Sequence, residues 1–360
     1  MRILFFIFIF LFLISALAQD QFNSYRWNRD NHDSRSGKID RTPWYEWWYY
    51  KIVLPETNEA FFFTHGVVNP WDEDYTLSGT RALVEVGDFQ SKKIFKKEVP
   101  VSEFAASYGE TLVEIGLFAQ ATDKKIRGSF DAISWDVDIK HEWTFNATGW
   151  ATGRQLTNIE WYPAQASAKC SGQIKSEQKI YQFTDAPCYQ DRNWGHSFPN
   201  WWSWIVSNNF ENNPDTVLVI GGGRPKITGG YEPIEGVAIG LRHQGKVISF
   251  RPNDMDYVQV NIHFGKWEVT GTNSQYRIEV SAFAPKEKFM DLTFMSPDGK
   301  VFHDYEALTG DIRVKLYTRP LFWGARWELQ EDLITHQGGI EFGSWKVQEI
   351  DKFFNSTYSF

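Results

Sequence analysis

Hydrophobic and polar residues alternate with a period of two in several stretches of this chain. In 276–282, Tyr, Ile, Val and Ala alternate with Arg, Glu and Ser, and in 312–316, Ile, Val and Leu alternate with Arg and Lys. This spacing places the two kinds of side chain on opposite faces of a β-strand, one exposed to solvent and one buried. The alternation in 237–241 passes through turn residues at 243–246 and resumes in 247–250, which predicts a β-hairpin.

Further strands are predicted at 47–54 and 61–68, which are bounded by Pro, Asn or Gly. The best helical candidate, 101–108, is short, and no stretch longer than ten residues carries a convincing 3.6-residue apolar stripe. Aromatic residues make up 17% of the chain, and they fit the pleated surface of a sheet. We therefore predict an all-β, antiparallel protein whose strands form closed or partly closed barrels, because closure removes exposed sheet edges.

The first eighteen residues carry the pattern of a secretory signal peptide. Residues 3–17 are almost all Phe, Ile and Leu, and the small residues at 16 and 18 predict cleavage before Gln19. An uncleaved membrane anchor is the alternative, although the apolar run is shorter than the ~20 residues that span a bilayer. Residues 19–42 are polar and unpatterned, and we expect them to form a flexible leader.

The length of 360 residues favours two domains, at roughly 100 to 200 residues each. We predict an N-terminal β domain at 43–190 and a C-terminal β domain at 191–352, with a single large domain as the alternative. The seam is expected near 185–195. Trp-rich stretches at 44–51 and 201–209 give a faint indication of an internal duplication.

Cys170 and Cys188 are the only cysteines of the chain. In the oxidising compartment that a signal peptide implies, we expect them to form one disulfide, since the segment between them reads as a hairpin. Two buried free thiols are the alternative. The sequons at Asn146 and Asn355 predict N-glycosylation, which fits a chain in the secretory pathway or outside the cell.

Charge and histidine spacing exclude two classes of partner. The formal net charge of -8 argues against nucleic acid, whose binding needs a basic surface. The eight histidines are scattered without metal-ligand spacing, so we expect no bound metal. The triplet Gly221-Gly222-Gly223 lacks the Lys-Ser or Lys-Thr of a phosphate-binding loop, and we interpret it as a hairpin connection. The oligomeric state is left open.

The most informative segment is 185–210, which reads DAPCYQDRNWGHSFPNWWSWIVSNNF. It places four tryptophans beside an acid, a base and amides, so that apolar surface and proton-transfer groups occur at one place. A site for a large, apolar and reactive molecule requires this combination. Strand alternation would place Trp202 and Trp204 on one face and Trp201 and Ser203 on the other.

The chain resembles the tocopherol cyclase family across most of residues 43–350. The resemblance rests on separated motifs in order, namely WYEWWYYKIVLP, FFFTHGVVNP, the segment 185–210, GGG at 221–223, GDIRVKLYTR and GGIEFGSW. It implies two lipocalin-like β-barrel domains and distant kinship with lipocalin-like carotenoid hydratases. For the plant and cyanobacterial members it implies closure of a chromanol ring from a prenylated hydroquinone, begun by protonation of an alkene. That chemistry needs no metal, nucleotide or redox cofactor.

Such a reaction needs an acid in a dry pocket and electron-rich rings around the resulting cation. Asp191 is the first candidate for the acid, His196 the second and Glu46 the third. Each candidate also has a simpler structural explanation. Asp191 could form an ion pair with Arg192 or a hydrogen bond in a turn, and His196 could cap a loop. Glu46 could be a buried acceptor of structural hydrogen bonds. A carboxyl acid would need a pKa raised by burial. We assign six residues to substrate binding: Trp48, Trp194, Trp202, Trp204, Tyr189 and Asn193. Any one of these tryptophans could instead fill a barrel core.

We therefore expect a proton-initiated cyclase or hydratase acting on a prenylated phenol or another hydrophobic isoprenoid, with peripheral membrane contact left open. A secreted protein that binds such a lipid without chemistry is the alternative, and a structural protein whose tryptophans only build core is a third. The signal peptide departs from the family, whose known members work in or near plastid or cyanobacterial membranes. Delivery to a complex plastid is the alternative to secretion, although the acidic residues after Gln19 are unlike a transit peptide.

Overall fold

Strands dominate the structure, a computed structural model that describes residues 22–27, 41–229, 234–321 and 324–348. This described part contains twenty-two β-strands and four short 3-10 turns. The strands form two large sheets in which neighbouring strands are antiparallel. The protein is therefore all-β, as the alternation of the sequence predicts.

The first sheet comes from the N-terminal half of the chain. Its strands are β1 (Tyr45–Leu54), β2 (Glu59–Val68), β3 (Arg81–Asp88), β4 (Lys93–Val99), β5 (Phe104–Ala106), β6 (Leu112–Ile115), β7 (Ala119–Thr122), β8 (Lys125–Phe130), β9 (Ile133–Trp143), β10 (Ile159–Ser176) and β11 (Lys179–Gly195). They lie in the order β4-β3-β2-β1-β11-β10-β9-β8-β7-β6-β5. Two turns, η1 (Val101–Glu103) and η2 (Gly149–Ala151), connect strands.

The second sheet comes from the C-terminal half. Its strands are β12 (Trp201–Ser207), β13 (Val217–Gly223), β14 (Gly236–His243), β15 (Lys246–Phe250), β16 (Tyr257–His263), β17 (Lys266–Thr272), β18 (Tyr276–Phe283), β19 (Met290–Asp291), β20 (Phe294–Met295), β21 (Val301–Thr318) and β22 (Glu328–Ser344), with turns η3 (Pro252–Asp254) and η4 (Lys286–Lys288). The order is β15-β14-β13-β12-β22-β21-β18-β17-β16, and β19 and β20 pair with β21. The chain passes from one sheet to the other between Gly195 and Trp201, whereas the expected boundary at 190/191 falls inside β11.

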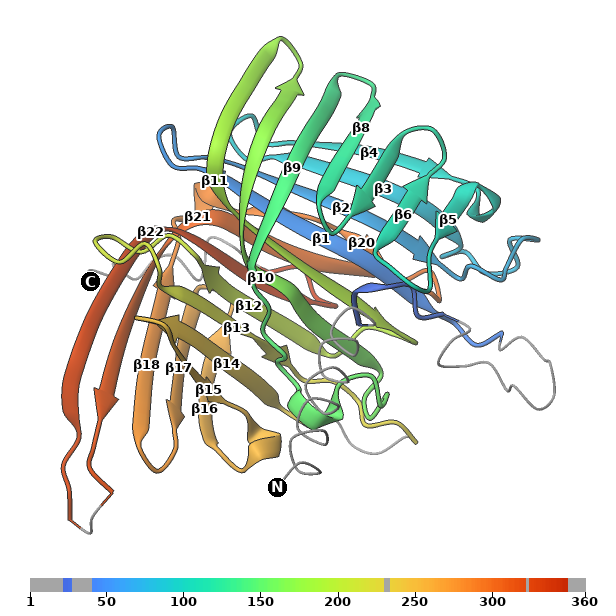
Figure 1. Cartoon of the computed structure of the whole chain (residues 1–360). Helices are drawn as coiled ribbons and strands as arrows, with labels where there is room; N and C mark the ends of the chain where they lie inside the picture. Colours follow the sequence, from blue (N-terminus) through green and yellow to red (C-terminus); the bar gives the residue numbers. More distant parts are fainter. Residues whose placement is uncertain (1–21, 28–40, 230–233, 322–323, 349–360) are drawn as a thin grey trace, which may run out of the picture.

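Each sheet curls into a nearly closed barrel, and the two barrels pack against each other (Figure 1). The first barrel is drawn in blue to green, and the second in yellow to red. The central strands β1 and β11 of the first sheet lie beside β12, β21 and β22 of the second. This confirms the expected pair of lipocalin-like antiparallel β-barrels. The predicted hairpin also forms, as β14 and β15.

The strands at the contact between the barrels are apolar on both faces, whereas 276–282 and 312–316 show the alternation that their sequence predicts. In β1, Trp48 and Ile52 point into the core of the first barrel, whereas Trp47 and Val53 point into a core between the two sheets. This interface core draws large side chains from both sheets, among them Phe62 and Tyr189 from the first and Trp204, Val219 and Phe302 from the second, and Phe145 joins it from the connection after β9. A separate core fills the second barrel. Only outlying strands such as β17 keep a plain alternation of buried and half-buried residues.

Two sequence-based predictions of local structure are wrong. The helical candidate at 101–108 is a three-residue 3-10 turn followed by β5, because it begins after Pro100 and its backbone then pairs with β6. The triplet 221–223 is the end of β13, paired with β12 and β14, and not a hairpin connection. A Cβ atom on Gly221 would lie 2.4 Å from the ring of Trp161. Glycine therefore serves there to make room for an indole.

Part of the segment expected to be a flexible leader is packed into the first barrel. Tyr25 belongs to the core of that barrel, and the main-chain carbonyl of Asn23 accepts hydrogen bonds from Trp48 Nε1 at 2.9 Å and from Thr111 Oγ1 at 3.0 Å. Residues 22–27 thus form part of the fold. The predicted signal peptide (1–18) and the sequon at Asn355 lie outside the described residues, as does the rest of the leader up to residue 40.

Cys170 on β10 and Cys188 on β11 form the predicted disulfide, with their Cα atoms 5.9 Å apart. The bond joins the two strands of the β10–β11 hairpin, as the sequence between the cysteines predicts. The glycosylation sequon at Asn146 lies between β9 and η2, where the side-chain Nδ2 donates to the carbonyl of Gly149 at 3.2 Å. Its glycosylation stays a prediction. Among the described residues, we find no helix with the length and apolar character that a membrane span needs.

Replacement of both cysteines by alanine should lower the free energy of unfolding by about 3 kcal/mol, because the disulfide constrains the unfolded chain across a separation of 18 residues. Urea unfolding followed by tryptophan fluorescence would measure the loss. The far-ultraviolet circular dichroism of the folded variant should match that of the oxidised parent, since the strands remain paired. An unchanged unfolding midpoint would show that the bond contributes no stability.

Candidate functional site

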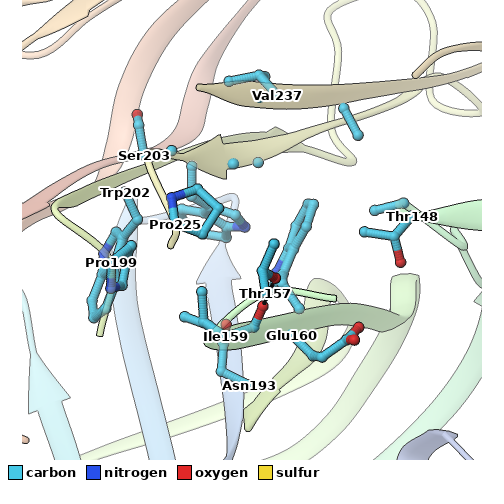
Figure 2. Close-up of a pocket in the computed structure, with 18 of the residues that line it drawn as sticks. Thr148, Thr157, Ile159, Glu160, Asn193, Pro199, Trp202, Ser203, Pro225 and Val237 are labelled. Carbon is cyan, nitrogen blue, oxygen red and sulfur yellow. Dashed lines mark hydrogen bonds between the residues drawn. The ribbon is translucent and has the colours of Figure 1, made fainter. Parts of the chain in front are cut away.

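A cavity of about 340 Å³ lies between the two sheets, outside both barrel cores. Strands β1, β10 and β11 line it from the first sheet, and β12, β13, β14, β21 and β22 line it from the second. In Figure 2, Ile159 and Asn193 lie on one side of the space, and Ser203 and Val237 lie on the other. The convex faces of the two barrels therefore form the walls of the candidate site.

Four indole rings form much of the cavity wall, from Trp47, Trp161, Trp202 and Trp204. Glycines on the facing strands give these rings their space. A Cβ atom would lie 2.4 Å from the Trp204 ring if placed on Gly339. The wall is thus aromatic on both sides, which suits an apolar ligand and a transient cation.

The cavity opens to the surface beside the connection that contains η2. Trp150, Leu156 and Ile234 line the cavity and are also exposed, at 55%, 45% and 48% of their surface. They mark an apolar mouth, whereas the carboxyl groups lie among buried residues. A long apolar ligand could therefore enter with its reactive end first.

Two acids of the first sheet line the cavity, Asp191 on β11 and Glu160 on β10, and Glu160 accepts hydrogen bonds from the main-chain N–H groups of Gly153 and Gln155. The Oδ2 atom of Asp191 accepts hydrogen bonds from Trp161 Nε1 at 2.7 Å and from the Tyr189 hydroxyl at 2.8 Å. The other oxygen, Oδ1, makes no hydrogen bond with the described residues. Because Oδ2 already accepts two donors, the proton of the neutral acid belongs on Oδ1. The arrangement presents an acidic proton to the cavity.

Burial raises the pKa of the Asp191 carboxyl to about 7, although the hydrogen bonds from Trp161 and Tyr189 act in the opposite direction. The simpler role considered for Asp191, an ion pair with Arg192, does not form. Adjacent residues of a strand point to opposite faces, so Arg192 points into the first barrel. Asp191 can therefore exist as a protonated acid near neutral pH, as its candidate role requires.

The second sheet places further carboxyl groups opposite Asp191. Asp304 on β21 and Glu341 on β22 line the cavity, and Glu306 lies beside them, where it accepts a hydrogen bond from the Tyr49 hydroxyl. Burial raises the pKa of Asp304 to about 7. Burial and the neighbouring acids raise the pKa of Glu306 and Glu341 well above the usual range. The cavity thus has acidic groups on two opposite walls.

Glu46, the third candidate acid, lies away from the cavity, inside the first barrel. It forms an ion pair with Arg192 in which both side chains are fully buried. The guanidinium of Arg192 also lies over the rings of Trp48 and Trp194, with its Cζ 4.8 Å and 4.6 Å from their centroids. Glu46 accepts further hydrogen bonds from the main-chain N–H groups of Arg26 and Trp27. The predicted site residues Glu46, Trp48 and Trp194 thus form a structural cluster with Arg192 that the cavity does not reach, because they point to the concave side of their strands.

His196, the second candidate acid, lies beyond the end of β11, and its Nδ1 contacts the carbonyl of Pro43 at 3.1 Å and the hydroxyl of Thr42 at 3.3 Å. It is not among the cavity residues. The structure does bring Trp202, Trp204 and Asn193 to the cavity with Asp191, and Tyr189 contacts that acid directly. The sequence argument missed Trp47, Tyr49, Trp161, Asp304, Glu306 and Glu341. A sequence signal exists for two of them, since Asp304 and Glu306 recur at a spacing of two and so lie on one face of a strand.

In the parts of the chain with described coordinates, no group of three or more His, Cys, Asp or Glu residues is arranged to hold a metal ion.

Comparison with known proteins gives one family and several distant relatives. A family model described as tocopherol cyclase-like matches residues 116–344. The Zea mays protein "Tocopherol cyclase, chloroplastic" is 22% identical over 356 aligned residues, and the Oryza sativa subsp. japonica protein "Probable tocopherol cyclase, chloroplastic" is 21% identical. Each match covers 84% of this chain and 75% of the relative. The crystal structure of kievitone hydratase from Nectria haematococca matches with a TM-score of 0.45 and 12% identity, covering 84% of this chain and 90% of that one.

The Trp161→Phe substitution should raise the pKa of Asp191 from about 7 to about 8. The indole N–H of the parent donates a hydrogen bond that stabilises the carboxylate, and the variant lacks this bond. The ¹³C shift of the Asp191 carboxyl, assigned with Asp191→Asn, would measure the titration. Trp47→Phe is the matched control, since that indole lines the same cavity without bonding to Asp191. A parent carboxyl that titrates near pH 4 would contradict the buried acid.

Proposed function

The chain belongs to the tocopherol cyclase-like family, and from this premise we propose that it closes a ring on a prenylated hydroquinone or a related isoprenoid phenol by protonating its double bond. Membership of the family supports an enzyme of the cyclase or isomerase type. One observation carries the finer proposal: Asp191 presents a buried carboxyl, with a pKa raised to about 7, to a cavity walled by indoles.

In the proposed reaction, the proton leaves Asp191 Oδ1 and forms a C–H bond at the less substituted carbon of the alkene. The hydrogen bonds from Trp161 and Tyr189 to Oδ2 hold the carboxyl in place and stabilise the carboxylate that remains. A carboxyl of ordinary pKa would be almost fully ionised at neutral pH and would have no proton to give. Burial between the sheets thus supplies the acid.

Protonation leaves a tertiary carbocation, which the phenol oxygen of the same molecule captures by forming a C–O bond. The faces of Trp47, Trp161, Trp202 and Trp204 can stabilise the cation, each by ~1 to 2 kcal/mol when water is excluded. Exclusion of water also prevents hydration of the cation before the ring closes. The apolar mouth at Trp150, Leu156 and Ile234 suits the isoprenoid chain of such a substrate.

Transport or storage of a hydrophobic isoprenoid without chemistry is the alternative use of the same cavity. It is supported by the apolar walls and would not require a protonated acid. Substitution of Asp191 distinguishes the two functions. It should abolish ring closure by an enzyme, whereas a carrier would bind its ligand equally well without the proton of Asp191.

We expect Asp191→Asn to lower kcat for ring closure by about 10²- to 10⁴-fold, the usual contribution of a positioned general acid. The assay incubates purified protein with a panel of prenylated hydroquinones and looks for a product of unchanged mass and altered retention. Activity of the parent protein should fall as the pH rises through about 7, because the reactive form of Asp191 is the protonated one. In D₂O, the product should carry deuterium on the former alkene carbon.

His196→Gln is the matched control, because His196 belongs to the same sequence motif but lies outside the cavity. This variant should turn over like the parent. Tight binding of the hydroquinones that is unaffected by Asp191→Asn, with no product from any of them, would favour the carrier function.

We also propose that the protein is located in the secretory pathway or the extracellular space. A complex plastid is the alternative. The disulfide between Cys170 and Cys188 supports an oxidising compartment. Expression of the full chain in a secreting eukaryotic host should give a protein that begins at Gln19 and loses mass on enzymatic removal of N-glycans from Asn146 or Asn355. Recovery of an intact N-terminus and an unmodified mass would contradict this route.

A further inference from the structure

The two carboxyl groups on the second sheet form a pair. Asp304 is buried on β21, Glu341 is partly exposed on β22, and both line the cavity opposite Asp191. Both groups lie on neighbouring strands at the same wall of the cavity, and each shifts the pKa of the other. Two carboxyl groups that interact in this way do not both ionise readily, so the arrangement favours a pair that holds one proton.

The surroundings place the negative charge of the pair on Asp304. The indole Nε1 of Trp202 donates a hydrogen bond to Asp304 Oδ1 at 2.9 Å, which favours the carboxylate. Burial and the two neighbouring acids on β21, Asp304 and Glu306, raise the pKa of Glu341 and favour its neutral form. Asp304 is therefore the charged member of the pair, and Glu341 is the neutral member.

The backbone is built to allow the bond from Trp202. In the sheet, Gly343 lies directly opposite both Trp202 on β12 and Asp304 on β21. A Cβ atom on Gly343 would lie 2.4 Å from the Nε1 atom of Trp202. Any side chain at this position would displace the indole from the space through which it reaches Asp304.

A purely structural role explains the pair poorly. Within the described residues, neither Asp304 nor Glu341 forms an ion pair, although burial of a carboxylate without a cation is costly. Asparagine and glutamine could link the same strands without that cost. An acid pair that faces a cavity, with its Asp304 member buried, indicates use of its proton chemistry.

The proposed ring closure has a second proton transfer. As the phenol oxygen bonds to the cation, its O–H bond must break and a base must accept the proton; where the proton and the oxygen add to opposite faces of the alkene, that base lies across the substrate from Asp191. We propose that Asp304 and Glu341 act as one unit in which the Asp304 carboxylate is this base, held by Glu341 and Trp202. This role rests on the proposed cyclisation.

The step balances without a further reactant. The Asp191 O–H bond breaks and a C–H bond forms; then a C–O bond forms while the phenol O–H bond breaks and Asp304 gains that proton. One proton has entered the substrate and one has left it, so the substrate and the product are isomers. Asp304 then returns its proton to Asp191 or exchanges it with solvent before the next turnover.

The test compares Asp304→Asn with Glu341→Gln in the ring-closure assay. Asp304→Asn should lower kcat by about 10²-fold, with KM near that of the parent, because the amide cannot accept the phenol proton. Run in D₂O, this variant should return unreacted substrate that contains deuterium, since Asp191 still protonates the alkene and the cation then loses a proton. Glu341→Gln keeps an N–H donor toward Asp304 and should stay within about tenfold of the parent kcat.

Folding and binding are controlled separately. His303→Gln is the matched control: His303 precedes Asp304 but contacts Asp291 at 2.9 Å and is not among the cavity residues, so this variant should behave like the parent. A hydroquinone with a saturated side chain cannot react, and its affinity should be similar for the parent and for Asp304→Asn. Loss of that affinity together with a raised KM would show a binding role and overturn the assignment of a base.

The outcomes separate this inference from the proposed function. Ring closure by Asp304→Asn at the parent kcat would overturn the role of the pair and leave Asp191 as the acid. Full activity of Asp191→Asn would overturn the proposed acid, while a defect confined to Asp304→Asn would still support the base. Absence of any ring-closed product from the parent protein would overturn both.

Discussion

Burial of carboxyl groups between the two sheets is the feature on which the candidate site depends. The convex faces of both barrels are aromatic, so they pack together and leave a small cavity between them. The same burial raises the pKa of Asp191 on one wall and of Asp304 on the other to about 7. In water both groups would titrate near pH 4, with roughly a thousandfold smaller protonated fraction at neutral pH. The fold loses free energy by burying these acids, and the proposed reaction uses the pKa shifts that this burial causes.

Neighbouring residues on β11 have separate tasks because a strand has two faces. Asp191 points to the cavity, and Arg192 points into the first barrel, where it pairs with Glu46. The buried ion pair and the cation–π contacts of Arg192 link β11 to β1. Since breaking a buried pair typically costs 3 to 5 kcal/mol, this link resists movement of the backbone that carries Asp191. The catalytic candidate thus depends on a cluster that never contacts the substrate.

Much of the fold and the first acid could be predicted from the sequence, because the necessary signals are local. Alternation along 276–282 and 312–316 identifies strands, and the segment 185–210 places Asp191 beside Trp202 and Trp204. The choice of face could not be predicted for Glu46, because both faces of β1 are apolar and the pattern does not say which one meets the other sheet. Asp304 and Glu341 come from strands far along the chain. Only the packing of the sheets shows that they lie opposite Asp191.

Residues 22–27 limit how far this chain can be trimmed. Their main-chain groups donate to Glu46 and accept from Arg192 and Trp48, so they complete the polar cluster inside the first barrel. Proteolytic maturation before Gln19 would spare them, whereas a cut even a few residues later would leave buried donors and acceptors without partners. An affinity tag joined at residue 28 would have the same effect. The stretch that looks most dispensable in the sequence therefore sets the upstream limit for a recombinant form that retains the whole barrel.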